Sequence, residues 1–435
     1  MKKRIMVDMS ATLLHHGHIR LLKNASEIGE VIVGLTSDKE IKLKKFYSPE
    51  LSFENRKEIL ESIKYVSEVV ETPWLIDEKI LDLHNIDLLV HGNDNSNTID
   101  SKKLKIFSRT QGISSSILRD RVLKSISGIN NHKMMLTPGP ALILHENLKN
   151  LKPVFGRGDN DYEFMLERVH KWVKKISGQD EVVISQGSST FSLELAAHSF
   201  VEGNVLLIST GYYSDRLKKL IPKNCKLTIC SHDEIEDINK NYDWILCAYT
   251  ETSIAYKINI QHVKKLALKC GAKLFIDATG SIGFEENHEL ADVMAFSSCK
   301  GLFGLAGASF IAYKKEMRPI KNDLFYFNIN TQKEKKVTGP YHAISSLFGV
   351  IDSHDILKKR VTASKELVLD DWEKYTRTEN QPLLCTYLKG KVSSKDDSVI
   401  LYTPRSELPG SVICHLGEIH HDELNILKRI SIESI

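Results

Sequence analysis

Short apolar runs and amphipathic stretches alternate along most of the chain, and this alternation is typical of an α/β protein. In the N-terminal part, apolar runs of strand length are separated by stretches with helical periodicity. The predicted strands are residues 4–10, 30–38 and 86–94, and the predicted helices are residues 18–29 and 53–66. Helices that connect successive strands in this way favour a small parallel sheet.

The same alternation starts again in the second part of the chain, after a polar segment at 123–134. Its predicted strands are residues 181–188, 204–210, 244–250, 273–280 and 293–299. After Tyr313 the pattern loosens into charged helices and short strands. We therefore expect an N-terminal domain at 1–128, a linker at 129–134, a large sheet domain at 135–315 and a smaller C-terminal domain at 316–435.

Composition and charge exclude several classes of protein. Of the 435 residues, 42% are hydrophobic and 26% charged, as in ordinary globular proteins, and the net charge is 59 − 56 = +3. Because no basic stripe stands out, a nucleic acid is not the expected partner. The seven cysteines form no Cys-x-x-Cys pair, no apolar run has the length of a membrane span, and Asp8 and three histidines interrupt the apolar N-terminus. We expect a cytoplasmic protein without membrane insertion.

His15, His16, Gly17 and His18 form the sharpest local motif, because they follow the first strand and begin the first helix. Backbone N–H groups and the helix dipole attract an anion at such a position. Gly17 would let a triphosphate approach the backbone, and His15 and His18 would donate hydrogen bonds to charge that develops on a transferred phosphorus. An isolated motif of this kind is as often a solvent-facing cap, but its position between strand and helix favours phosphate chemistry.

A second element of the phosphate-binding type, Ser-Arg-Thr-Gln-Gly-Ile-Ser-Ser-Ser, occupies residues 108–116, directly before a helical pattern. Serine hydroxyls, helix-start amides and the forked guanidinium of Arg109 suit phosphate oxygens. Together with the His-x-Gly-His motif, this element resembles the cytidylyltransferases of the glycerol-3-phosphate and phosphonate type, over about residues 1–128. The Val-Asp-Met-Ser-Ala opening is nearest to the phosphonate branch. The resemblance implies a Rossmann-like nucleotidyltransferase domain that uses CTP with Mg²⁺.

By this resemblance, His15 and His18 stabilise the α-phosphate during its transfer. The implied nucleotide-binding residues are Gly17, Lys44, Lys45, Asp94, Arg109 and Ser114. The sequence departs from the family at three positions: Thr12 and Asn93 each replace an aspartate, and Gln111 replaces a glutamate. Because Thr12 has no carboxylate, it stays open whether this position contacts the metal or the nucleotide. Taken alone, the lysine-rich stretch 39–45 would be a solvated helix face.

Lys300 and Asp277 are the candidate catalytic pair in the second part. Lys300 follows one predicted apolar strand and Asp277 ends the apolar run of the strand before it, so they are 300 − 277 = 23 residues apart. A pyridoxal phosphate enzyme needs a lysine that bonds covalently to the cofactor and a carboxylate that keeps its pyridine nitrogen protonated. Because a lone lysine after a buried strand is more often a surface residue, the assignment depends on the surroundings of the pair.

These surroundings supply a phosphate site, an aromatic ring and a hydroxyl group. Ser188, Ser189 and Thr190 precede a predicted helix, Tyr213 could stack on a pyridine ring, and Thr252 could bond to the phenolic oxygen of the cofactor. With the Leu-Thr-Pro-Gly-Pro segment at 136–140, they resemble the class V aminotransferases, and within these the 2-aminoethylphosphonate:pyruvate transaminases, over about residues 134–430. The resemblance implies a fold type I aminotransferase with a large parallel-to-mixed sheet domain and a small C-terminal domain.

By this second resemblance, Lys300 and Asp277 carry the catalysis and hold pyridoxal 5'-phosphate with Ser188, Ser189, Thr190, Tyr213 and Thr252. Thr338 would reach the cofactor of a neighbouring subunit, which implies a homodimer. Val412 stands where the family has an arginine for the substrate carboxylate, and Arg405 is the candidate replacement. His415, His420 and His421 are interpreted as the start of a surface helix, and no protein-bound metal is expected.

The leading hypothesis is a bifunctional enzyme. One half would aminate phosphonoacetaldehyde with alanine as donor, and the other would couple the resulting 2-aminoethylphosphonate to CTP, giving CMP-2-aminoethylphosphonate for a surface glycan or lipid. Fusion would raise the local concentration of the intermediate. An alternative keeps both reactions but converts dihydroxyacetone phosphate to serinol phosphate and then to CDP-serinol. A further alternative makes one half an inactive binding or dimerisation module.

Overall fold

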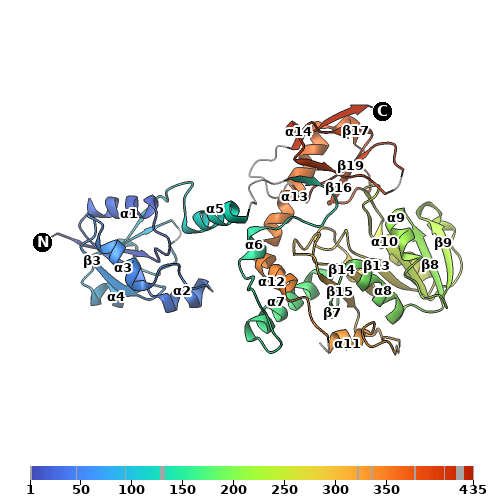
Figure 1. The fold of residues 1–435 in the computed structure, drawn as a ribbon, viewed down its shortest axis with the longest axis horizontal. Coiled ribbons are helices and arrows are strands. Elements are labelled where there is room, and N and C mark those ends of the chain that lie inside the picture. Colours follow the sequence, from blue (N-terminus) through green and yellow to red (C-terminus); the bar gives the residue numbers. More distant parts are fainter. Residues whose placement is uncertain are drawn as a thin grey trace. The chain divides into compact units, whose positions relative to one another are not determined.

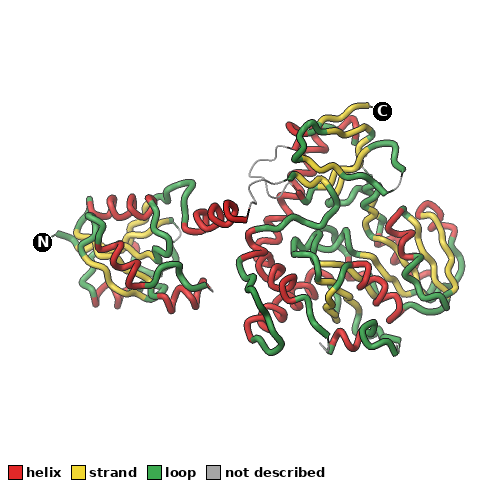
Figure 2. The backbone as a smooth tube through the Cα atoms, viewed as in Figure 1, coloured by secondary structure: helices red, strands yellow, loops and turns green. Residues whose placement is uncertain are grey.

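The computed structural model describes residues 2–45, 47–93, 95–127, 133–320, 323–334, 337–376, 379–405, 407–417 and 426–434. Its internal contacts divide the chain into two compact units, Met1–Asn131 and His132–Ile435 (Figure 1). Both units combine helices and strands, as Figure 2 shows by colour. The predicted α/β class is confirmed.

The N-terminal unit contains a five-stranded sheet in the order β3-β2-β1-β4-β5, and every strand pair in it is parallel. The strands are β1 (Arg4–Met9), β2 (Glu30–Thr36), β3 (Glu68–Thr72), β4 (Leu88–Gly92) and β5 (Leu104–Phe107). The direction of strand order reverses between β1 and β4. In open sheets of this kind, ligands bind at the carboxyl ends of the strands beside such a reversal.

Helices cover both faces of this sheet. They are α1 (His16–Ser26), α2 (Asp38–Lys45), α3 (Phe53–Glu61), α4 (Glu78–Leu83) and α5 (Ser115–Ser127), with a 3₁₀ turn at Ser101–Lys103. Alternate residues of β1 point to opposite faces: Val7 packs with Leu22 of α1, whereas Met6 packs with Leu81 of α4. Each large apolar side chain buried in this way stabilises the fold by about 1.5–3 kcal/mol.

The second unit is built on a seven-stranded sheet in the order β7-β15-β14-β13-β10-β8-β9. Its strands are β7 (Glu181–Gln186), β8 (Asn204–Ser209), β9 (Lys226–Ser231), β10 (Trp244–Ala248), β13 (Lys273–Asp277), β14 (Val293–Ser297) and β15 (Ala308–Tyr313). β15 runs antiparallel to both of its neighbours, and the other pairs are parallel. The central strands are mostly apolar because both faces of the sheet are covered.

One apolar cluster joins one face of this sheet to α7 (Asn160–Ser177), α10 (Ile260–Lys269) and α12 (Tyr341–Val350), and a second cluster joins the other face to α8 (Ser189–Phe200). Shorter elements connect these layers. They are α6 (His145–Leu148), α9 (Tyr212–Leu217), β11 (Thr250–Glu251), β12 (Tyr256–Lys257) and α11 (Ile329–Lys333), with 3₁₀ turns at His232–Asp237, His288–Leu290, Ile351–Ser353 and Glu373–Tyr375.

A smaller layer of strands packs on α13 (His354–Asp371) around a core of its own. It contains β16 (Cys385–Leu388), β17 (Gly390–Ser393), β18 (Val399–Leu401), β19 (Ser411–Cys414) and β20 (Ser431–Ser434), with α14 (Ile426–Arg429). β6 (Met134–Leu136) also belongs here, because Met134 pairs with Val399 and Leu136 with Leu401. The first strand of the second unit therefore packs with the last part of the chain. No helix among the described residues is long and apolar enough to span a membrane.

Candidate active sites

His15 and His18 cap the N-terminus of α1 reciprocally. His15 Nδ1 accepts a hydrogen bond from the Gly17 backbone N–H at 3.2 Å, and His18 Nδ1 accepts one from the His15 backbone N–H at 3.3 Å. A neutral imidazole whose Nδ1 accepts a hydrogen bond carries its proton on Nε2. Both rings are therefore left with an Nε2–H donor, which is what a phosphate oxygen needs.

The electrostatic surroundings keep these rings neutral. Burial, and then the neighbouring His15, lower the pKa of His18 to about 4. Burial, followed by His16 and Arg109, also lowers the pKa of His15. At neutral pH the imidazoles of His15 and His18 are thus neutral, and each can donate a hydrogen bond from Nε2.

Gly17 is required by the close packing of this turn. A Cβ at Gly17 would lie 2.9 Å from Cε1 and Nδ1 of His15, and 3.4 Å from Ile113 Cγ2. The absence of a side chain therefore lets His15 bend back over the helix start and make its cap.

A cavity of about 640 Å³ opens beside the motif. Of the residues predicted to bind the nucleotide or to act in catalysis, His15, Gly17, His18, Lys45 and Arg109 line it. Lys44 and Ser114 are not among its lining residues, and Asp94 lies outside the described residues.

The start of α5 shows how the predicted serines divide their roles. The Ser114 hydroxyl accepts a hydrogen bond from the Ile117 backbone N–H at 3.1 Å and so caps the helix. Ser115 and Ser116 line the cavity instead, and Arg109 is held by its backbone N–H, which donates to Asn93 Oδ1 at 2.9 Å.

Arg119 is the hydrogen-bond partner of Thr12, the residue that replaces the family's aspartate. The sequence analysis did not identify Arg119. Its Nη2 donates to the buried Thr12 hydroxyl at 2.7 Å. The same guanidinium forms an ion pair with Glu50 and lies 4.5 Å from the centre of the Tyr47 ring. The hydrogen bond from Arg119 also lowers the pKa of Glu50. Arg119 thus ties the segment before α3 to the turn after β1.

Arg56 is a second cation that only the structure places. It is 1% exposed, and it donates to the backbone oxygens of Ser10 at 2.6 Å and Thr36 at 3.0 Å, which follow β1 and end β2. It also bonds Asp38 Oδ1 at 2.5 Å. This side chain fixes the carboxyl edge of the sheet from which the cavity opens.

Asp8 is a third residue that sequence reasoning did not assign to the site. It stands near the end of β1, is 8% exposed and lines the cavity. Its Oδ2 accepts a hydrogen bond from Asn97 Nδ2 at 2.9 Å and lies 3.7 Å from His91 Nε2 on β4. A carboxylate at the end of an otherwise apolar strand was the available signal in the sequence.

In the second unit, Asp277 ends β13 and Lys300 follows the neighbouring strand β14. Asp277 Oδ1 accepts from the Thr279 backbone N–H at 2.9 Å, and its Oδ2 lies 3.4 Å from Arg216 Nη2. Burial lowers the pKa of the Lys300 ammonium, and Asp277 opposes this shift. Lys300 Nζ lies 5.6 Å from the centre of the Tyr213 ring, so lysine, carboxylate and ring share one site.

The polar groups around this pair fit pyridoxal phosphate. Among the described residues, five buried side-chain atoms at the carboxyl ends of the sheet have no hydrogen-bond partner: Thr210 Oγ1, Arg216 Nε, Thr250 Oγ1, Thr252 Oγ1 and Thr279 Oγ1. Burying unpaired polar atoms is costly, so their concentration here points to a polar ligand. Ser188 occupies the N-cap position of α8 without a side-chain cap hydrogen bond, and Ser189 and Thr190 begin the helix. Arg216 Nη1 donates to Thr190 Oγ1 at 3.3 Å.

Glu251 holds Tyr213 in place. This fully buried carboxylate accepts from the backbone N–H groups of Tyr213 at 2.9 Å and Ser214 at 3.1 Å. Its other oxygen accepts from the Ser253 hydroxyl at 2.5 Å. Burial raises the pKa of Glu251, and these donors oppose the shift. The start of α9, and the ring that faces Lys300, are thereby fixed.

The segment after β6 passes directly beside Lys300. A Cβ at Gly139, where φ is +121°, would lie 3.1 Å from Lys300 Cγ, and the Ala141 backbone N–H donates to Cys299 O at 2.6 Å. The Pro-Gly-Pro sequence therefore lets the backbone lie against the stem of the lysine.

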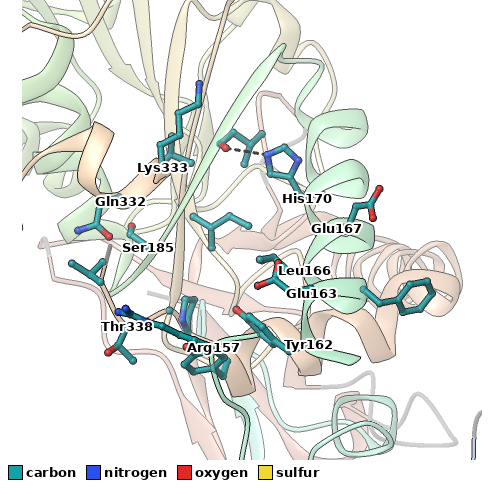
Figure 3. A pocket seen from close by; sticks show the side chains of 18 of the residues that line it. Arg157, Tyr162, Glu163, Leu166, Glu167, His170, Ser185, Gln332, Lys333 and Thr338 are labelled. Atoms are coloured by element: carbon teal, nitrogen blue, oxygen red, sulfur yellow. Dashed lines mark hydrogen bonds between the residues drawn. The ribbon is translucent and has the colours of Figure 1, made fainter. Parts of the chain in front are cut away.

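Thr338 is exposed and lines a different cavity, of about 870 Å³, along the edge strand β7. Figure 3 shows it beside Arg157 and near Tyr162 of α7. None of the other residues predicted to bind the cofactor lines this cavity. A role of Thr338 toward a neighbouring subunit stays a prediction.

Val412 stands where the resemblance implies an arginine for the substrate carboxylate, and apolar side chains surround it. Val412 on β19 is 3% exposed and packs with Ala255, Cys385 and Tyr387. Arg405 is exposed, and its Nη1 donates to the Tyr212 hydroxyl at 3.1 Å, next to Tyr213 in the chain.

The histidines near the C-terminus were interpreted as the start of a surface helix, and for His415 this is wrong. His415 is fully buried, and its Nε2 is paired with the Thr386 hydroxyl at 2.9 Å. His420 and His421 lie outside the described residues. Within the described part of the chain, no three His, Cys, Asp or Glu side chains gather as metal ligands would.

Comparison with known proteins gives a separate result for each unit. The family model described as cytidylyltransferase-like matches residues 11–121. The glycerol-3-phosphate cytidylyltransferase of Bacillus subtilis (strain 168) is 35% identical over 125 residues, which cover 28% of this chain and 97% of that enzyme.

The second unit is similar to a 2-aminoethylphosphonate–pyruvate transaminase of Pseudomonas aeruginosa, with 25% identity over 198 residues, or 41% of this chain. The chain spans about half the length of this relative, 53%. The crystal structure of an alanine–glyoxylate aminotransferase from Nostoc sp. superposes with a TM-score of 0.58 at 17% identity, covering 68% of this chain and 93% of that one. This last likeness shows the fold.

Proposed function

Because the chain belongs, through its N-terminal unit, to the cytidylyltransferase-like family and continues into an aminotransferase homologue, we propose that it is a bifunctional enzyme. It aminates a small carbonyl compound that carries a phosphonate or phosphate group, and it then couples the aminated product to CTP. The observation that carries the proposal is the presence of two separate sets of reactive side chains, one around His15 and His18 and one around Lys300 and Asp277.

In the N-terminal unit, an oxygen of the phosphonate or phosphate attacks the α-phosphorus of CTP, and the bond from that phosphorus to the bridging oxygen breaks to release pyrophosphate. The Nε2–H groups of His15 and His18 donate to the oxygens on which charge builds. The triphosphate is held by Lys45, Arg109 and the amides at the start of α5. The sequence analysis also predicted that Lys44, Asp94 and Ser114 bind the nucleotide. Mg²⁺ bound with CTP would supply positive charge to the leaving pyrophosphate.

In the second unit, pyridoxal phosphate supplies a ring that accepts electrons from the substrate carbon. Ser188, Ser189 and Thr190 hold its phosphate, as the start of α8 favours. Asp277 would keep a proton on the ring nitrogen of the bound cofactor. Arg216 and the Thr279 amide keep that carboxylate in place.

The remaining cofactor residues position the ring and move the proton. Tyr213 would stack on the bound ring, and the Thr252 hydroxyl would bond to its phenolic oxygen. Lys300 Nζ, whose pKa burial lowers, takes and returns the proton of the substrate carbon. A homodimer, in which Thr338 approaches the partner subunit's site, and a cytoplasmic location are part of the same proposal.

For the substrate, we propose phosphonoacetaldehyde with alanine as amino donor, giving 2-aminoethylphosphonate and then CMP-2-aminoethylphosphonate. The name of the Pseudomonas aeruginosa relative supports this choice. The alternative route runs from dihydroxyacetone phosphate through serinol phosphate to CDP-serinol. Val412 is buried among apolar side chains, so β19 offers no arginine at this position for the carboxylate of the amino donor, which both routes share.

The test is one incubation read by mass spectrometry. The purified chain, pyridoxal phosphate, Mg²⁺, CTP and alanine are mixed with phosphonoacetaldehyde in one arm and dihydroxyacetone phosphate in the other. The proposal predicts CMP-2-aminoethylphosphonate in the first arm, whereas CDP-serinol in the second would select the alternative. Formation of neither product, or full pyrophosphate release in excess chelator, would contradict the proposal.

A further inference from the structure

The segment that joins α2 to α3 borders the cavity of the N-terminal unit. Lys45, the last residue of α2, and Tyr47 line this cavity, and Lys45 Nζ lies 5.2 Å from the centre of the Trp74 ring, which also lines it. Glu50 belongs to the same segment and is not a lining residue. A carboxylate close to a site for a triphosphate opposes binding by its charge, unless it acts through a cation.

That cation is Arg119, which holds Glu50 with a forked pair of hydrogen bonds. Arg119 Nη2 donates to Glu50 Oε2 at 2.7 Å, and Arg119 Nε donates to the other oxygen of the carboxylate. A pair of this kind fixes the direction of both side chains as well as their distance. The hydrogen bond from Arg119 lowers the pKa of Glu50, and the charges of Arg119 and Lys45 act in the same direction. The carboxylate is therefore ionised at neutral pH.

The guanidinium of Arg119 is also fixed on the side that faces away from Glu50. The Thr12 hydroxyl, 1% exposed as a residue, accepts from Arg119 Nη2 at 2.7 Å, and the Tyr47 ring centre lies 4.5 Å from Arg119 Cζ. An aspartate in place of Thr12 would compete with Glu50 for the charge of Arg119. Because threonine accepts a hydrogen bond without a charge, Glu50 remains the anionic partner.

The ion pair joins two parts of the proposed triphosphate site that are far apart in the sequence. Arg119 lies on α5, whose first amides belong to that site, and Glu50 follows Lys45 by five residues. The two paired residues are 69 positions apart. The position of Lys45 relative to the start of α5 thus depends on this contact.

We propose that the ion pair between Arg119 and Glu50 positions Lys45 for the triphosphate, so that Glu50 strengthens CTP binding although its own charge repels CTP. This inference rests on the proposed cytidylyl transfer and makes Arg119 and Glu50 positioning residues of that site. The competing explanation is that Arg119 binds the triphosphate itself. Glu50 would then weaken the site by occupying the guanidinium, so the two explanations predict opposite effects of removing its charge.

The experiment measures the Kd of CTP with Mg²⁺, and that of CMP, by titration calorimetry of the full chain without a nucleophile. The proteins are the wild type, Glu50→Gln, Arg119→Gln and the double variant. Glutamine has the shape of glutamate, and the Glu50 side chain is 37% exposed, so the fold tolerates the change. The control is Glu54→Gln, which removes the same charge from an exposed residue of α3 that does not line the cavity.

We expect Glu50→Gln to raise the Kd of CTP about tenfold, the effect of losing one hydrogen bond to a charged group, and to leave the Kd of CMP unchanged. Glu54→Gln should leave both values unchanged. The double variant should bind CTP as Arg119→Gln does, because each substitution breaks the same contact. In the pyrophosphate assay, Glu50→Gln should raise the KM for CTP and keep kcat, since a positioning contact of this kind acts on binding.

Three results would overturn the inference while the proposed function stands: an unchanged or lower Kd of CTP in Glu50→Gln, an equal rise for CMP and CTP, or effects of the two substitutions that add. The first result, together with weaker binding in Arg119→Gln, would assign Arg119 to direct contact with the triphosphate. If the wild type neither binds CTP nor releases pyrophosphate with any of the proposed nucleophiles, the proposed cytidylyl transfer itself fails, and the inference with it.

Discussion

Replacing His18 by asparagine separates the two functions that the structure gives to this ring. Its Nδ1 accepts from the His15 backbone N–H, and its Nε2–H remains for the substrate. The asparagine Oδ1 branches from Cγ as Nδ1 does, so it preserves the cap, whereas its side chain ends short of Nε2. We expect His18→Asn to keep the start of α1 intact and to lower kcat for cytidylyl transfer by about 10²–10³, the effect of losing one preorganised donor.

His18→Ala is the matched comparison, because alanine removes the cap as well as the donor. Its kcat should fall as far as that of His18→Asn, and loss of the cap should cost the helix a further ~1 kcal/mol. Pyrophosphate release at saturating CTP measures the first effect, and hydrogen exchange of the α1 amides measures the second. Near wild-type turnover in His18→Asn would refute the donor role of Nε2. Equal loss of amide protection in both variants would refute the tautomer assigned to His18.

Four further outcomes follow from the two sites. Lys300→Ala should abolish amino transfer and the near-visible absorbance of bound cofactor while CTP turnover continues, which assays of the two reactions on one sample will check. Gly17→Ala should lower cytidylyl transfer about tenfold or more by pushing the His15 ring from its place, measured as kcat. Because the pKa of His18 falls to about 4, the N-terminal unit should lose stability as pH drops from 6.5 toward 4, followed by urea unfolding. Arg56→Met should destabilise this unit by about 3–5 kcal/mol, measured in the same way.

Local sequence patterns predicted the parts of the fold and the sites that depend on neighbouring residues. The strand before His15, the strand that ends at Asp277 and the strand before Lys300 show in the apolar pattern because almost every residue of each is buried. The helix after His15 shows because its apolar residues Leu22 and Ala25 are buried on one face. Short edge elements were not predicted: β5 has four residues and no fully buried side chain, so its pattern is weak.

Other features depend on distant parts of the chain and could not be predicted. Neither the spacing nor the residue type shows that Lys45 lines the cavity while Lys44 does not, because the facing of α2 is set by tertiary packing. The hydrogen bond from Arg119 to Thr12 joins residues 107 positions apart. The burial of His415 likewise depends on Thr386, which lies on another strand.

The pairing of β6 with β18 determines where the polypeptide can be cut. Residues 134–136 lie at the junction of the two halves in the sequence, yet they supply a strand to the C-terminal layer and lead into Gly139, which lies against Lys300. A truncated chain that starts at Lys133 retains both contacts. One that starts after Leu136 removes the parallel partner of β18 and frees the segment beside the lysine. Dissection of the halves, for separate expression or exchange of either one, therefore has to cut the chain before Met134.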